Sequence, residues 1–131
     1  MKFRKTIGIA AAALTLGVIG APQAMAADEW MYTDDSNPGA GVEFTAYGDV
    51  FKLCDVDNAD GYGVELRVFD TTINEGEFLV ENKNGSGCKT YRASMGSKYD
   101  LHEGSLLSVT ICLLDGTVSK YCDDALWMNE N

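Results

Sequence analysis

Short runs in which apolar and polar residues alternate recur along the chain beyond residue 30. The clearest is 105–114, where every second residue from Leu107 to Leu113 is apolar and those between, such as Ser108 and Thr110, are mostly polar. A period of two is typical of a β-strand with one face buried. Because this run is the most apolar of the set, we expect it in the middle of a sheet.

Similar but shorter runs predict the rest of the fold. They cover residues 30–33, 42–47, 50–55, 64–69, 78–83 and 118–122. Clusters of Gly, Asn, Asp and Pro separate them, and no segment beyond residue 26 keeps a helical period. Six to eight short strands, with turns about every ten residues, indicate an all-β fold, a small antiparallel β-sandwich of Ig-like or Greek-key type. A small barrel is the alternative.

One turn signal predicts a specific pairing. Asn-Gly at residues 84–85 favours a two-residue hairpin turn between the strands on either side. Such a turn would set Phe78 opposite Tyr91 and Glu77 opposite Arg92. An aromatic pair on one face and an opposite-charge pair on the other both stabilise an antiparallel ladder.

The four cysteines predict two disulfide bonds. They are Cys54, Cys88, Cys112 and Cys122. No two of them have the C-x2-C or C-x4-C spacing of a zinc site, and the chain has one histidine. Of three possible pairings we prefer Cys54–Cys88 with Cys112–Cys122, since the latter two flank a turn expected at residues 115–116. A tight turn there would set Ser119 opposite Cys112, so this pairing requires a longer or bulged connection. We expect both bridges on sheet faces or in loops.

The N-terminus has the three parts of a secretory signal peptide. The basic residues are Lys2, Arg4 and Lys5, the apolar run is 7–20, and small residues flank Met25. We expect cleavage after Ala26, which removes residues 1–26 and leaves one secreted domain, 27–131. The alternative, a membrane anchor, needs about 20 apolar residues, more than this run offers.

The charge of the chain restricts its partners. Its net charge is −10, and all 20 acidic residues but only seven of the ten Lys and Arg follow residue 26, which leaves −13 after cleavage. Nucleic acids and anionic membranes bind through Lys and Arg, so we expect neither as a partner. The simplest interpretation of the negative charge is that self-repulsion keeps the protein soluble. More specific interpretations are that it binds a basic partner or divalent cations.

One segment has the residue types of a calcium loop. Asp55, Asp57, Asn58 and Asp60 supply the hard oxygen ligands that calcium prefers. The EF-hand pattern fails, however, because Ala59 stands at its fifth position and Asp60 at its sixth. Asp, Asn and Gly also form ordinary turns. We therefore expect a turn without a cofactor, with a weak calcium site as the alternative.

Catalytic residues are not assigned. His102, the single histidine, lies beside Glu103 in a segment that is typical of an exposed loop. A nucleophile and an orienting group would be needed beside it, and no G-x-S-x-G motif is present. We therefore expect a protein that is not an enzyme, with a small extracellular hydrolase that uses His102 as an alternative.

Four aromatic residues are candidates for a binding surface: Trp30, Tyr32, Tyr62 and Trp127. Exposed Trp and Tyr often anchor binding partners, although the terminal segments could instead pack back and bury them. The sequence thus favours a secreted, non-enzymatic binding protein for an extracellular protein or glycan, with inhibition of an extracellular hydrolase as one form. A calcium-assisted carbohydrate-binding module is the second hypothesis.

Overall fold

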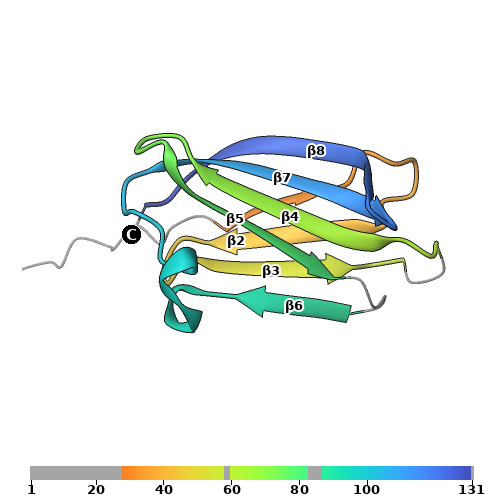
Figure 1. The fold of residues 1–131 in the computed structure, drawn as a ribbon, viewed down its shortest axis with the longest axis horizontal. Helices are drawn as coiled ribbons and strands as arrows, with labels where there is room; N and C mark the ends of the chain where they lie inside the picture. The colour runs from red at the N-terminus through yellow and green to blue at the C-terminus, as the bar shows by residue number, and fades with distance from the viewer. Residues whose placement is uncertain (1–27, 58–59, 83–86, 131) are drawn as a thin grey trace, which may run out of the picture.

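Two antiparallel four-stranded sheets face each other in the computed structural model, which describes residues 28–57, 60–82 and 87–130 (Figure 1). The first sheet, sheet A, contains β1 (Glu29–Tyr32), β2 (Ala40–Thr45), β3 (Val50–Asp55) and β6 (Gly87–Tyr91), in that order. The second, sheet B, has the order β5 (Glu75–Asn82), β4 (Gly63–Asp70), β7 (Leu106–Asp115) and β8 (Val118–Met128). Two short 3-10 helices, η1 (Ala93–Met95) and η2 (Ser97–Tyr99), connect β6 to β7.

Three connections pass from one sheet to the other. They are β3 to β4, β5 to β6 and β6 to β7, so β3 pairs with β6 and β4 pairs with β7. Crossed connections of this kind are found in Ig-like and Greek-key sandwiches. The predicted sandwich is therefore confirmed, and the barrel alternative is wrong.

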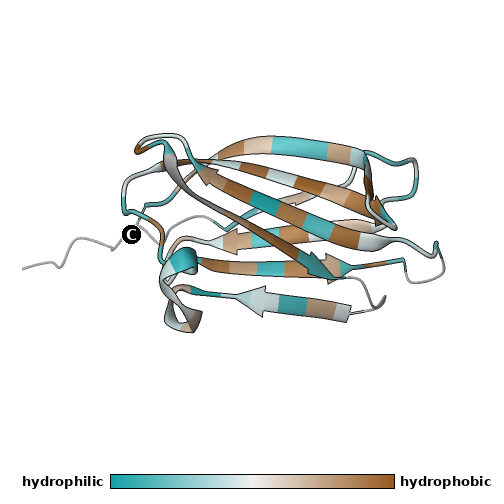
Figure 2. Cartoon of the chain, viewed as in Figure 1, coloured by the Kyte–Doolittle hydropathy of each residue, from teal (hydrophilic) through white to brown (hydrophobic). Residues whose placement is uncertain are grey.

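The alternating runs supply the core between the sheets. The inward residues of β7 are at most 1% exposed, and in the register of the sheet Ile111 lies opposite Leu66 and Val109 opposite Val68. Apolar and polar residues alternate along β4 in Figure 2 as the period of two requires. Burying each such side chain stabilises the fold by about 1.5–3 kcal/mol. The prediction that 105–114 occupies the middle of a sheet is confirmed, since β7 lies between β4 and β8.

The C-terminal strand is longer than the sequence indicated. The prediction ended it at residue 122, whereas β8 continues to Met128. Trp127 lies opposite Leu107 and is 5% exposed, and its ring stacks on Phe44 with the centroids 6.0 Å apart. The segment is a strand because this ring closes one side of the core. Trp127 is therefore part of the hydrophobic core.

The hairpin predicted at residues 84–85 is wrong. These two residues lie outside the described ranges, but β5 pairs with β4 while β6 pairs with β3 in the opposite sheet. Phe78 and Tyr91 are therefore not cross-strand neighbours. Each instead contacts the ring of Tyr99, with centroids 5.2 and 5.6 Å apart. Local turn chemistry does not reveal that the chain crosses the sandwich at this point.

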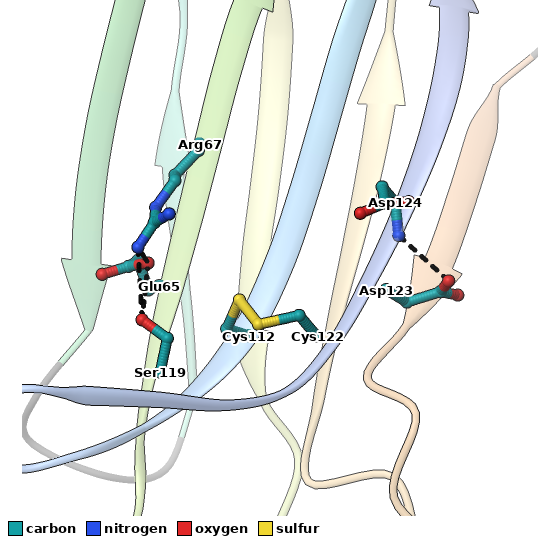
Figure 3. The surroundings of a disulfide bond; sticks show 7 residues. All are labelled: Glu65, Arg67, Cys112, Ser119, Cys122, Asp123 and Asp124. Carbon is teal, nitrogen blue, oxygen red and sulfur yellow. Dashed lines mark hydrogen bonds and ion pairs between the residues drawn. A yellow bond between two sulfur atoms is a disulfide. The ribbon is translucent and has the colours of Figure 1, made fainter.

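Both predicted disulfides are present. Cys54 and Cys88 lie directly opposite each other on β3 and β6, with their Cα atoms 4.0 Å apart. Cys112 and Cys122 connect β7 to β8 with a Cα separation of 4.1 Å (Figure 3). Neither bond belongs to the apolar cluster between the sheets, but Cys112 itself is buried, at 1% exposed. In the chain-entropy model, closing these loops contributes about 3.8 and 2.7 kcal/mol respectively.

A β-bulge makes the second disulfide possible. The turn lies one residue later than predicted, because Asp115 pairs with Val118 around Gly116 and Thr117. A regular ladder would then set Tyr121 opposite Cys112. Tyr121 instead adopts φ +51°, and both Tyr121 and Cys122 stand opposite the single residue Cys112. An extra residue of this kind bends a strand and redirects its side chains.

The first 27 residues lie outside the described ranges, so the signal peptide at residues 1–26 and its cleavage stay predictions. In the part of the chain that the structure describes, no helix combines the length and the apolar character needed to cross a membrane.

Candidate binding surface

The outer face of sheet A carries two exposed aromatic side chains. In β1, Met31 points into the core and is 7% exposed, so its neighbours Trp30 and Tyr32 point outward. They are 66% and 47% exposed. Of the four aromatic residues predicted to bind, these two therefore lie together at the surface, whereas Tyr62 is half-buried elsewhere and Trp127 belongs to the core.

The two rings have a fixed arrangement. Tyr32 lies opposite Gly41, and a Cβ atom added there would come within 2.8 Å of ring atoms Cδ1 and Cε1. The ring of Tyr32 therefore packs directly against the backbone of β2. Trp30 meets it in an edge-to-face contact, with centroids 5.4 Å apart and an interplanar angle of 64°. A pair held in this way loses little conformational entropy when a partner binds.

Beside the rings lies a shallow hollow of about 250 Å³, here called the aromatic hollow. Its lining includes Trp30, Tyr32, Glu43, Lys52, Cys54 and Val56. The strand register explains the arrangement, since Trp30, Glu43 and Lys52 form one row across three strands. Apolar rings, a carboxylate and an ammonium group therefore share one face.

The first disulfide supports this surface. Gly41 lies opposite Tyr32 on one side and opposite Cys54 on the other, and Cys54 is bonded to Cys88. A row of directly paired residues thus runs across all four strands of sheet A. The covalent bond joins β6 to β3 at Cys54, which itself lines the hollow. It therefore limits the motion of the sheet that supports the two rings.

A second hollow of about 210 Å³ lies where the β1–β2 and β3–β4 loops meet the bulge of β8. We call it the acidic hollow, and its lining includes Asp35, Asn37, Asp57, Asp60, Tyr62 and Tyr121. Hydrogen bonds hold its loops, since the Asn37 amide donates to Asp57 Oδ2 at 3.3 Å and the Tyr62 N–H donates to Asp60 Oδ1 at 2.7 Å. The Gly39 N–H likewise donates to Asp35 Oδ2 at 3.1 Å.

The structure separates the residues of the predicted calcium loop. Asp57 and Asp60 both line the acidic hollow, whereas Asp55 ends β3, is 5% exposed and is not among the lining residues. Asn58 lies outside the described residues. Within those that are described, no group of three or more His, Cys, Asp or Glu is arranged to hold a metal. The hollow also contains Asp35, which the sequence reasoning missed because only strand pairing brings its loop there.

His102 is exposed in the turn before β7, as predicted. Its Nδ1 atom lies 3.4 Å from Ser105 Oγ. Ser105 is 0% exposed, and its backbone is bonded to the carbonyl of His102 and to the N–H of Asn129. The Ser105 hydroxyl is fully buried, so its contact with His102 lies inside the turn before β7.

At the same end of the sandwich lies a buried carboxyl group. Asp49 is 1% exposed, and its Oδ2 atom accepts a hydrogen bond from the Leu101 N–H at 2.8 Å. Burial raises the pKa of Asp49 above its ordinary value, because water no longer solvates the charged form. The hydrogen bond from the Leu101 N–H and the nearby amide of Asn129 oppose this effect on the pKa, while the charges of Glu103 and Asp100 add to it.

No protein-family model, no curated protein and no solved structure matches this chain. Its function is therefore inferred from its own residues, and the outer face of sheet A with the adjoining loop end is the strongest candidate site.

Proposed function

We propose that this chain is an exported, non-enzymatic binding protein that holds a protein partner on the outer face of sheet A. The observation that supports this best is the exposure of Trp30 and Tyr32 side by side on a rigid sheet. Trp and Tyr are the residues most often found at the energetic centre of protein interfaces. An aromatic pair of this kind is more typical of an interface than of an unoccupied surface.

Export accounts for the cross-links. Both disulfides of the chain join neighbouring strands, and such bonds form and persist in oxidising compartments outside the cytoplasm. The predicted signal peptide at residues 1–26 would deliver the chain to such a compartment. Outside the cell, the two disulfides would keep the strands that form the binding surface in place.

Comparison of four tagged baits tests the proposal. The wild-type chain, Trp30→Ala, Tyr32→Ala and Tyr47→Ala are each used to capture extracellular proteins from culture fluid of the producing cell. Tyr47 is the control, because it is 79% exposed but lies in the β2–β3 turn, away from the hollow. Replacing an aromatic anchor by Ala costs 2 kcal/mol or more, which corresponds to roughly 30-fold in Kd.

We expect a partner retained by the wild type and Tyr47→Ala and lost by the other two. A partner that all four baits retain equally would place the interface elsewhere. Failure to capture any partner, together with no inhibition of a panel of extracellular hydrolases, would contradict the proposal as a whole.

A glycan is the second candidate, because Glu43 and Lys52 beside Trp30 can bind hydroxyl groups while a sugar ring stacks on the aromatic side chain. The 64° angle between Trp30 and Tyr32 favours a protein instead, since the two rings do not form one flat platform. Titration of the intrinsic tryptophan fluorescence with soluble hexasaccharides distinguishes the two. Quenching that Trp30→Ala abolishes would favour the glycan.

A further inference from the structure

Negative charge is concentrated in the part of the chain that forms both hollows. Residues 28–62 contain nine Asp and Glu but one basic residue, Lys52. The two hollows together are lined by the carboxylates of Asp28, Glu43, Asp35, Asp57 and Asp60. The surface that carries the exposed aromatic pair is therefore strongly acidic, and electrostatic complementarity favours a basic partner.

The acidic hollow combines two kinds of group that bind a cationic side chain. Carboxylates form charge-assisted hydrogen bonds to guanidinium and ammonium groups. Tyr62 and Tyr121 also line this hollow, and a tyrosine ring can hold a cation over its face. The fold already makes one such contact, with Lys120 Nζ 5.8 Å from the centroid of the Tyr62 ring.

Lys120 does not fill the hollow. Its Nζ atom is 2.6 Å from Asp115 Oδ2, and Lys120 is not among the lining residues. The hydrogen bond to Asp115 raises the pKa of Lys120, which favours its charged form. Lys120 is therefore paired with Asp115 and does not line the acidic hollow.

The two hollows adjoin each other along one short stretch of backbone. Val56 lines the aromatic hollow and Asp57, the next residue, lines the acidic hollow, so their Cα atoms are about 3.8 Å apart. Both residues donate backbone hydrogen bonds to the Gly39 carbonyl, at 2.8 and 3.2 Å. Consecutive residues of the β3–β4 connection therefore line the two hollows.

We propose that the partner presents a Lys- or Arg-rich polypeptide segment, which places a basic side chain in the acidic hollow beside the aromatic pair. This inference rests on the proposed function, because it takes the outer face of sheet A as the binding surface. In this proposal Asp57 and Asp60 select a basic side chain of the partner. Tyr62 and Tyr121 then contact the bound cation.

The test measures fluorescence anisotropy of labelled octaarginine with the whole disulfide-bonded protein, and octaglutamate serves as the control peptide. Asp57→Asn with Asp60→Asn removes two charges from the hollow while keeping oxygen acceptors for Asn37 and Tyr62. Asp100→Asn with Glu130→Gln removes two exposed charges at the opposite end of the sandwich. Comparing these two double variants separates a specific site from the general attraction of an acidic protein.

We expect octaarginine to bind the wild type, to bind the Asp57/Asp60 variant at least fivefold more weakly, and to bind the Asp100/Glu130 variant within twofold of the wild type. Tyr121→Asn provides a second variant, because Asn tolerates the positive φ of this position. It should weaken binding at least threefold without changing net charge, even if the double variant fails to fold.

If both double variants lose the same amount of octaarginine affinity, binding depends on the net charge of the protein and not on the acidic hollow, and the proposal is overturned. Binding of a neutral hexasaccharide that octaarginine does not displace would do the same and identify a glycan surface. These results are distinct from failure of the proposed function, in which Trp30→Ala and Tyr32→Ala leave capture of the natural partner unchanged.

Discussion

Asp49→Asn is expected to stabilise this protein at neutral pH. Asp49 is 1% exposed at φ +51°, and its Oδ1 atom lacks a hydrogen-bond partner among the described residues. Asn has nearly the same shape, tolerates this φ and keeps an oxygen that can accept from Leu101.

The sign of the pH dependence follows from the direction of the pKa shift. Burial raises the pKa of Asp49 in the folded state above the ordinary 3.8. The folded protein therefore holds this proton more tightly than the unfolded chain, and its stability falls as pH rises from 3.8 through the folded-state pKa. The buried carboxyl group of Asp49 therefore lowers stability at pH values above the ordinary 3.8, and this cost disappears as pH falls below 3.8.

An unpaired buried acceptor costs about 1–3 kcal/mol, and more when it is charged. We therefore expect Asp49→Asn to raise the free energy of unfolding by about 1–3 kcal/mol at pH 7. Each kcal/mol corresponds to about 4–8 °C in Tm for a domain of 60–100 residues. Urea and thermal unfolding followed by circular dichroism at pH 7 and pH 3 measure both effects, with Asp124→Asn as the exposed control, since Asp124 does not act on the pKa of Asp49.

The gain should shrink to a small difference at pH 3, where Asp49 is protonated. A variant that is less stable than the wild type at pH 7, or one whose gain is the same at both pH values, would refute this reasoning.

Three further outcomes are expected. Cys112→Ser with Cys122→Ser should lower the free energy of unfolding by about 2.7 kcal/mol, measured by urea unfolding without reductant; no loss would mean that the bulge forms without the bond. Gly41→Ala should displace the Tyr32 ring, because the added Cβ atom would lie 2.8 Å from it, whereas a Cβ atom at Gly116 meets nothing within 4 Å. Titration calorimetry should therefore show weaker partner binding for Gly41→Ala than for Gly116→Ala. EDTA should leave Tm within about 1 °C of the untreated value, because Asp55 is buried at the end of β3 and does not line the hollow with Asp57 and Asp60; a clear fall would support the calcium hypothesis.

The strands were predictable where one face is buried. Residues 50–55 form β3 as expected, because Phe51 and Leu53 alternate with polar residues and are 0% exposed. The disulfide pairing also followed from spacing, although the bulge that permits Cys112–Cys122 did not. A bulge depends on a single left-handed residue, Tyr121, and tyrosine has no preference for that conformation that a sequence could reveal.

The long-range features were not predictable from local patterns. An Asn-Gly turn signal at 84–85 says nothing about which sheet the next strand joins, so the expected pairing of Phe78 with Tyr91 was wrong. The acidic hollow depends on loops from distant parts of the chain, and its Asp35 was not singled out. The sequence could not distinguish the exposed Trp30 from the buried Trp127, because each lies near one end of the domain in a similar sequence context.

Fluorescence of Trp30 tests the location of the binding surface most directly. The chain contains two tryptophans, so Trp127→Phe leaves Trp30 as the sole reporter. Acrylamide should quench this exposed indole efficiently in the free protein, and a bound partner should protect it. A partner that binds the Trp127→Phe protein with full affinity while Trp30 remains as accessible to acrylamide as before would contradict the assignment of the outer face of sheet A.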